Sequence, residues 1–306
     1  MYPFKFQPVY KSLVWGGTRL QQLFARELPG AAIGESWEIC TRENGMSVVA
    51  NGGWAGKTLQ ELLAAHPREI LGERNAAAGN FPLLVKFIDA NDNLSVQVHP
   101  SDEYAFRVER EPGKTEAWYV LAARENAQIV YGLKAGISRE RFIQAVASST
   151  VGDMLRTVPV KAGDMIFVPA GLVHALLEGV VVCEVQQNSD TTYRVYDYDR
   201  PGTDGKPREL HVNKALDVID FDLQPEADFS NNRIACEYFS METCRIAGEQ
   251  QENTNNHYLI FSFTSGKGNI LYQGFSEAVK AGDTILIPAC LDTVTLQGDL
   301  QYIKIR

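Results

Sequence analysis

The sequence predicts a mainly β protein built as two jelly-roll barrels with a few covering helices. Many short apolar runs are separated by turns containing Gly, Pro or Asn, and little of the chain shows helical spacing. One segment also occurs twice: KAGDMIFVPAGLVHALL begins at Lys161, and KAGDTILIPACLDTVTL begins at Lys280. Because both copies have the pattern of a strand, a turn and a strand, we expect two related barrels.

The first part of the chain is predicted to contain short strands and two helices. Residues 1–56 hold several strand-like pieces split by turns. The first helix is expected over residues 18–24 and the second over residues 58–65, where Leu59, Leu62 and Leu63 have the spacing of one buried face. We expect both helices to cover a sheet.

The rest of the chain alternates between predicted strands and turns. Within residues 81–98, PLLVKFID, NDN and LSVQVH indicate a strand, a turn and a strand, and we expect them to form a hairpin. AWYVLAA and AQIVYGL are two more strands, followed by a helix over residues 138–147. Strands return in VKAGDMIFVPAGLVHAL and GVVVCEVQQ, and again as short strands from about residue 222. The polar stretch 197–209 is too long for a hairpin turn and is predicted to be an active-site loop or lid.

The composition is that of an ordinary globular protein. Of 306 residues, 45% are hydrophobic and 22% charged, and the net charge of -9 argues against a surface for nucleic acid or anionic membrane. No apolar run approaches the roughly 20 residues of a transmembrane helix, and the N-terminus lacks the layout of a secretion signal, so we expect a cytoplasmic protein. Five cysteines without CxxC spacing indicate neither a disulfide framework nor a thiolate metal cluster.

The segment SVQVHP contains the first part of a predicted metal site. Ser95, Gln97 and His99 occupy every second position, so their side chains share one strand face. Glu116 opens a later apolar run in KTEAW, and His174 follows the turn-like PAG. Two His, one Glu and one Gln on three strands form a nitrogen and oxygen ligand set that suits a divalent first-row metal, most simply zinc.

Basic residues occur near the predicted ligands, and the second copy of the repeat lacks the ligand histidine of the first. Lys114, Arg194 and Arg200 can make the pocket locally positive for an anionic substrate. In the second copy of the repeat, Thr293 stands where His174 stands in the first. We therefore expect residues 1–220 to form a catalytic metal-binding domain with N-terminal strands and inserted helices, and residues 221–306 to form a related domain without a metal site.

Taken together, these motifs resemble the type I phosphomannose isomerases, in their short bacterial form. These are zinc-dependent enzymes of the cupin superfamily, and the resemblance spans nearly the whole chain. It implies two cupin-type barrels, one zinc per chain and the interconversion of mannose 6-phosphate and fructose 6-phosphate. The implied zinc ligands are Gln97, His99, Glu116 and His174. The resemblance further implies active-site roles for Lys114, Ser95, Glu184 and Arg194.

The chemistry of an aldose–ketose isomerase requires a base, an electrophile and a group that holds the substrate. A proton is removed next to the carbonyl, an enediolate is stabilised, and the proton returns to the neighbouring carbon. Either Lys114 or Glu184 could move that proton, and the sequence does not choose between them. Arg194 stays charged and is expected to stabilise the enediolate or the phosphate, with Arg200 as a second phosphate candidate. Ser95 is a candidate for substrate binding.

Two other classes of function compete with the isomerase. A metal-dependent cupin oxygenase would normally use iron held by two His and one carboxylate, and Gln97 as an additional ligand argues against it. A non-enzymatic sugar-binding or regulatory cupin would not need Lys114, Glu184 and Arg194 together. We therefore expect a small-molecule sugar phosphate as the partner, with no nucleic acid and no membrane, while the oligomeric state is left open.

Overall fold

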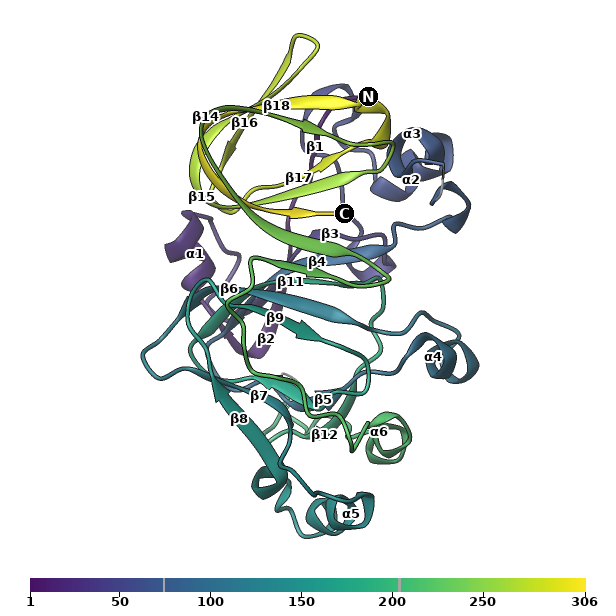
Figure 1. Cartoon of the computed structure of the whole chain (residues 1–306), viewed down its shortest axis with the longest axis vertical. Helices are drawn as coiled ribbons and strands as arrows, with labels where there is room; N and C mark the ends of the chain where they lie inside the picture. The colour runs from purple at the N-terminus through teal and green to yellow at the C-terminus, as the bar shows by residue number, and fades with distance from the viewer. Residues whose placement is uncertain (74, 203–204) are drawn as a thin grey trace.

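The computed structural model describes residues 1–73, 75–202 and 205–306, and in these ranges the chain forms three antiparallel sheets with short helices on the outside (Figure 1). The α-helices are α1 (Arg19–Phe24), α2 (Leu59–Ala65), α3 (Pro67–Leu71), α4 (Asp102–Val108), α5 (Arg139–Ala147) and α6 (Val212–Val218). Helices α1, α2 and α5 lie where the sequence predicts helices. A capping box between Thr58 and Glu61 begins α2, and Ser138 caps α5.

Two of the sheets face each other. The six-stranded sheet has the order β2-β3-β4-β11-β6-β9, and the five-stranded sheet has the order β12-β5-β10-β7-β8. The bounds of the first set are β2 (Val9–Gly17), β3 (Ile33–Ile39), β4 (Leu83–Ala90), β6 (Glu116–Ala123), β9 (Met165–Val168) and β11 (Val180–Gln187). The bounds of the second set are β5 (Val96–Val98), β7 (Gln128–Leu133), β8 (Leu155–Pro159), β10 (His174–Leu176) and β12 (Tyr193–Tyr196). Ile88, Val120 and Val182 pack against Ile129 and Leu176 in one buried cluster between the sheets.

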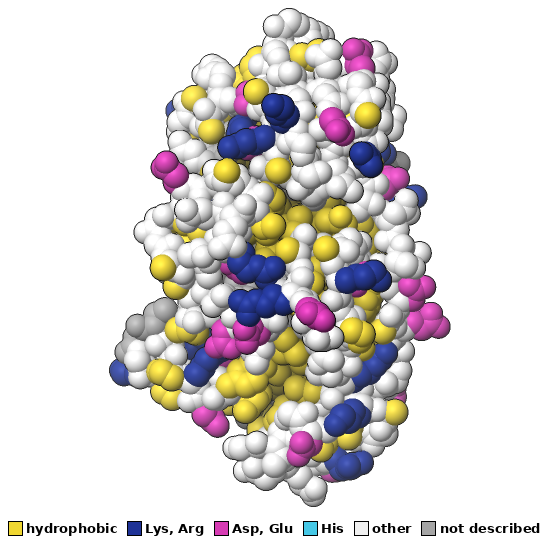
Figure 2. All heavy atoms as spheres, turned by 90° about the vertical axis from the view of Figure 1, so that its left-hand side faces the viewer, with side chains coloured by type: hydrophobic (Ala, Val, Ile, Leu, Met, Phe, Trp, Pro, Cys, Tyr) yellow, Lys and Arg dark blue, Asp and Glu magenta, His cyan; other side chains and the backbone are white. Residues whose placement is uncertain are grey.

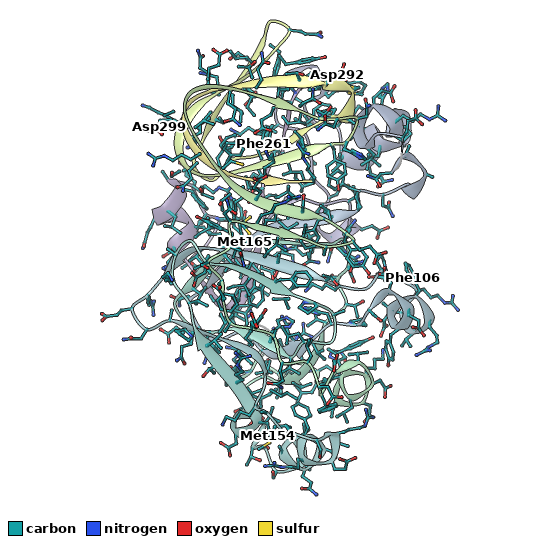
Figure 3. The ribbon with its side chains drawn as sticks, viewed as in Figure 1. Phe106, Met154, Met165, Phe261, Asp292 and Asp299 are labelled. Carbon is teal, nitrogen blue, oxygen red and sulfur yellow. The ribbon has the colours of Figure 1, made fainter. Side chains whose placement is uncertain are left out.

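The third sheet is seven-stranded and contains the C-terminal part of the chain together with the first strand. Its order is β1-β17-β15-β18-β14-β13, with β16 paired to β15. The bounds are β1 (Phe4–Lys5), β13 (Arg233–Ala235), β14 (Ser240–Asn253), β15 (Leu259–Tyr272), β16 (Phe275–Lys280), β17 (Thr284–Ile287) and β18 (Thr293–Ile305). These strands curl around a buried core that contains Phe261, whereas Phe106 lies outside on α4 (Figure 3).

The six-stranded sheet is covered on both faces, which explains the almost wholly apolar sequence of β4. Val85 and Phe87 belong to the cluster that also contains Met241 and Ile303 of the seven-stranded sheet. Ile88 belongs to the cluster shared with the five-stranded sheet. Since side chains alternate along a strand, a central strand covered on both sides is apolar throughout, and the fully buried β4 follows that rule at every position but Lys86 and Asp89.

The predicted hairpin of residues 81–98 is wrong. Strand β4 pairs with β3 and β11, whereas β5 pairs with β10 and β12 in the facing sheet. The turn between them is held by the carbonyl of Trp15, which accepts hydrogen bonds from the backbone N–H groups of Asn91 and Asp92. The turn residues predicted from sequence therefore carry the chain from one sheet to the other.

The expectation of short C-terminal strands is confirmed for β13, β16 and β17, with 3, 6 and 4 residues, but not for β14, β15 and β18, which have 14, 14 and 13. Glycines at one level let these long strands curl: Gly298 pairs with Gly248 on one side and Gly268 on the other. A Cβ on Gly298 would lie 2.5 Å from the carbonyl oxygen of Lys267, and its φ of 139° disfavours any other residue. Bent long strands thus replace several short ones.

The repeated segments have the same succession of elements. Strand β9 and strand β17 occupy equivalent positions in the two copies, and each is followed by a turn at Pro169 or Pro288. His174 and Thr293 then begin β10 and β18. Within the described ranges, no helix combines the length and apolar character needed to cross a membrane.

Candidate active site with a metal-ligand cluster

One polar row crosses the inner face of the five-stranded sheet. In the strand register, Gln97 on β5 lies opposite His174 on β10 and Arg194 on β12. The amide nitrogen of Gln97, as placed, is 3.4 Å from Nε2 of His174. His99 follows β5, two positions after Gln97, and its ring centroid is 4.8 Å from that of His174. The predicted alternation of Gln97 and His99 therefore places both beside His174.

Glu116, the first residue of β6, completes a cluster with the two histidines. One ligand atom from each of His99, Glu116 and His174 can be chosen so that all lie within 4.8 Å of one another, and the three residues are buried. Nε2 of His99 is 3.4 Å from Oε2 of Glu116, and Nε2 of His174 is 3.4 Å from Oε1. Neighbouring ligands about 2.1 Å from a tetrahedral metal ion are about 3.4 Å apart, so these separations fit such an ion.

The hydrogen bonds that the two histidines make at Nδ1 leave the lone pair on each Nε2 available to a cation or a hydrogen-bond donor. Nδ1 of His99 lies 3.0 Å from the carbonyl oxygen of Thr191, and Nδ1 of His174 lies 2.9 Å from that of Leu172. A proton on Nδ1 that is donated to a carbonyl leaves a lone pair on Nε2, as in most metal-binding histidines. Burial, followed by the charge of Lys114, lowers the pKa of His99 to about 3, and burial also lowers the pKa of His174. Both rings are therefore neutral.

The acceptors of this cluster face one another, and this favours a cation between them. Burial opposes ionisation of Glu116, but the neighbouring Lys114 and His99 hold the pKa of its carboxyl well below the usual range. Its Oε2 accepts no hydrogen bond from the described residues, although Nζ of Lys114 lies 3.1 Å away. Lys114 also donates to Nε2 of His99 at 3.0 Å. Two neutral imidazoles and a carboxylate form a donor set that fits zinc.

A second polar row crosses the facing, six-stranded sheet. Glu184 on β11 lies opposite Lys86 on β4 and Trp118 on β6, and Lys86 in turn lies opposite Trp37. The indole Nε1 of Trp118 donates to Glu184 at 3.0 Å and to Glu116 at 3.1 Å. This indole therefore connects the carboxylate of the ligand cluster with the carboxyl group on the facing sheet.

Glu184 is held in an environment that favours its neutral form. Burial raises the pKa of Glu184, and the charge of Glu116 raises it further, while Lys86 and Lys114 oppose the shift. Nζ of Lys86 lies 3.3 Å from Glu184 and 3.7 Å from Glu35, and these carboxylates, despite burial, keep the pKa of Lys86 raised. Glu184 thus combines a raised pKa with an adjacent permanent cation, a combination typical of a group that gives and takes a proton.

A pocket of about 130 Å³ lies between the two rows. Five of the sequence-predicted site residues line it, namely Ser95, Gln97, Lys114, Glu184 and Arg194. His99, Glu116 and His174 are buried directly behind Lys114 and Gln97. Arg200 is not among the lining residues; its guanidinium pairs with Asp92 and Asp197. A larger groove of about 1150 Å³ runs beside α4, but it contains none of the predicted ligands.

Several pocket residues were missed by sequence reasoning, and only some of them had a signal. Lys86 is a lone Lys inside the apolar run PLLVKFID, and a charge in a buried strand is rare enough to indicate function. Trp15 and Trp118 line the pocket, whereas Trp37 is not among the lining residues and donates to Glu35. Arg208 lies in a polar stretch with several other charges, and nothing in its sequence distinguishes it.

Facing antiparallel sheets with a buried His, Glu and His cluster define a β protein with a pocket and a candidate metal site between its sheets. Residues 3–120 match the family described as phosphomannose isomerase type I, catalytic domain, and residues 230–306 match the mannose-6-phosphate isomerase cupin domain. The mannose-6-phosphate isomerase of Streptococcus mutans is 38% identical over 98% of this chain and 97% of its own. The chain belongs to the type I phosphomannose isomerase family.

Solved structures agree with this assignment. The mannose 6-phosphate isomerase from Bacillus subtilis is 37% identical, covers 100% of both chains and superposes with a TM-score of 0.93. A mannose 6-phosphate isomerase bound with zinc and yttrium is 18% identical, covers 100% of this chain and 99% of its own, and has a TM-score of 0.81. The second comparison extends the likeness of fold to a distant relative.

Proposed function

We propose that this chain is a zinc-dependent isomerase that interconverts mannose 6-phosphate and fructose 6-phosphate. The observation that carries the proposal is the pairing of two walls in one pocket. One wall has neutral imidazoles and a carboxylate suited to a metal, and the other has Glu184, a carboxyl group with a raised pKa. Membership of the family supports the sugar phosphate as substrate.

The ligands of one zinc ion per chain would be His99, Glu116, His174 and Gln97. Gln97 would bind through its amide oxygen, which faces Nε2 of His174 when the amide group is turned by 180° about its terminal bond. When bound, zinc supplies positive charge that stabilises the negative oxygen of the enediolate. All four of these ligands lie within residues 1–220, so we assign catalysis to that part of the chain and none of the metal ligands to residues 221–306.

We assign the proton transfer to Glu184 rather than to Lys114. Nζ of Lys114 lies 3.0 Å from Nε2 of His99 and 3.1 Å from Oε2 of Glu116, so its charge is directed at the ligand cluster rather than at a substrate carbon. Burial and the charge of Glu116 raise the pKa of Glu184, whereas Lys86 and Lys114 favour its ionised form, so each protonation state has neighbours that stabilise it. Glu184 takes a proton from C1 or C2 of the substrate and returns it to the neighbouring carbon.

Arg194, Ser95 and Arg200 act on substrate binding in this proposal. The guanidinium of Arg194 has no hydrogen-bond or ion-pair partner among the described residues, so its donors are available to a substrate oxyanion. The Ser95 hydroxyl lines the pocket and can bond a sugar hydroxyl. Arg200 acts on substrate binding indirectly, because its guanidinium is paired with Asp197 at 3.0 Å and helps to hold that carboxylate in place.

Turnover of mannose 6-phosphate to fructose 6-phosphate in a coupled assay tests the proposal. The protein is assayed as purified, after chelation, and after addition of zinc or, as a control, of magnesium. We expect activity to disappear with the chelator and to return with zinc, because the ligand set is rich in nitrogen and suits zinc better than magnesium.

Two results would contradict the proposal in different ways. Full turnover by protein shown to be metal-free would remove zinc from the mechanism. Absence of turnover by zinc-loaded, folded protein would favour a sugar-binding role, and oxygen uptake by iron-loaded protein would favour a cupin oxygenase instead.

A further inference from the structure

Arg208 lines the same pocket as Gln97, Lys114 and Glu184, although the polar stretch that carries it lies outside both sheets. Its side chain is 22% exposed. The residues that line the pocket include four cationic side chains (Lys86, Lys114, Arg194 and Arg208) and three acidic ones (Glu35, Glu184 and Asp190). The pocket is therefore locally positive in a chain whose net charge is -9.

The guanidinium of Arg208 is fixed by a bidentate contact with a buried carboxylate. Nε donates to Oδ2 of Asp197 at 2.7 Å, and Nη2 donates to Oδ1 at 2.6 Å. Asp197 also accepts from Arg200 at 3.0 Å, so one carboxylate holds two cations. This geometry uses one edge of the Arg208 fork and leaves Nη1 without a hydrogen bond to the described residues.

Arg194 brings a second guanidinium to the same place. Its Nε is buried and has no hydrogen-bond partner in the described part of the chain. Arg194 and Arg208 line the same pocket. Burial lowers the pKa of Arg194 and the charge of Arg208 lowers it further, while Asp197, Asp190 and Glu209 oppose the shift. Two guanidinium groups therefore line one pocket, and that of Arg194 makes no ion pair within 4.0 Å with the described residues, so together they form a site for a doubly charged anion.

We propose that Arg208, together with Arg194, binds the phosphate of the substrate, and that Asp197 holds Arg208 in position for this contact. The assignment rests on the proposed function for the sugar end of the pocket, where Gln97 and Glu184 lie. Arginine suits this task because its planar fork matches two phosphate oxygens at once.

The variant Arg208→Gln tests the assignment, with Arg42→Gln as a matched control. Arg42 is 21% exposed and is also paired with a carboxylate, that of Glu111, but it lies outside the pocket. For each protein, KM and kcat for mannose 6-phosphate, the inhibition constant of inorganic phosphate, and the zinc content are measured. Loss of a charge-assisted contact is expected to raise KM and the inhibition constant about tenfold or more, with kcat within about threefold of the original.

The outcomes separate this inference from the proposed isomerase activity. Unchanged KM and phosphate inhibition in Arg208→Gln would overturn the inference, and so would a loss of kcat with unchanged phosphate inhibition. If Arg208→Gln loses zinc or unfolds, Arg208→Lys replaces it, and a rise of about threefold in both constants is expected because the charge remains while the fork is lost. If the unmodified protein does not turn over mannose 6-phosphate, calorimetric binding of inorganic phosphate to both proteins still decides the role of Arg208.

Discussion

Replacing Trp118 by Phe tests the connection between the two walls of the pocket. The indole Nε1 donates to both Glu184 and Glu116, and the ring packs edge-on against His174 with centroids 5.6 Å apart. Phe keeps an aromatic ring at this position and removes the N–H donor together with part of the volume of the buried indole. The ionised form of Glu184 is stabilised by that donor, so its loss should raise the pKa of Glu184 beyond the increase that burial already causes.

The size of the effect follows from the hydrogen bond that is lost. A hydrogen bond to a charged group contributes about 1.5–3 kcal/mol, and about 1.4 kcal/mol corresponds to one pKa unit. Because the donor is shared between two carboxylates and Lys86 remains at 3.3 Å, we expect a shift of about one unit. A base is inactive when protonated, so a higher pKa moves the acidic limb of kcat/KM to higher pH by the same amount.

The assay is the pH profile of kcat/KM for mannose 6-phosphate, measured on zinc-saturated protein. Zinc content must be determined at each pH, since the same substitution also removes a donor from the ligand Glu116. Trp54→Phe is the control, because Trp54 packs against His66 and its indole makes no hydrogen bond to the described residues. An acidic limb that stays in place in Trp118→Phe would refute the assignment of Glu184 as the proton carrier.

Two further predictions concern buried charge. Lys86→Met removes the cation between Glu184 and Glu35, so we expect the free energy of unfolding at neutral pH to fall by about 3–5 kcal/mol. Urea denaturation measures this change. An equal loss at acid pH, where the carboxylates are protonated, would contradict the loss of ion pairs as its cause. Zinc-free protein should become less stable as pH falls from about 6.5 toward 3. In that window His99 is protonated in the unfolded chain but stays neutral in the folded chain, where its pKa is about 3. A His99→Gln variant should show a weaker pH dependence in the same denaturation series, and parallel curves would contradict the prediction.

The proposed metal ligands were accessible to sequence reasoning because strand geometry determines their spacing locally. Gln97 and His99 share a face by alternation alone, and their spacing survives whichever strands β5 pairs with. Glu116 and His174 each begin a strand, where the preceding turn marks the position in sequence. The proposed ligand set can therefore be predicted from short segments of the sequence.

The pairing of strands was not accessible in the same way. The turn NDN reads equally well as a hairpin turn or as a crossing between sheets, and only the contact of Asn91 and Asp92 with Trp15, far earlier in the chain, distinguishes the two. Arg208 poses the same difficulty, since its proposed role in phosphate binding depends on its closeness in space to Asp197 and Arg194. Lys86 is the opposite case, because a lone Lys in an apolar strand was visible in the sequence and was passed over.

The position of Glu184 depends on sheet packing, and this connects the catalytic pocket to the C-terminal part of the chain. Glu184 faces the pocket, while its neighbours Cys183 and Val185 face the opposite side and pack in the cluster that contains Met241 and Ile303 of the seven-stranded sheet. Met165, at the edge of the same cluster, lies between the two parts of the molecule (Figure 3). The face in Figure 2 shows Lys and Arg interspersed with Asp and Glu, with no large area of one sign. The seven-stranded sheet therefore supports the back of β11 by apolar packing, on the face opposite Glu184.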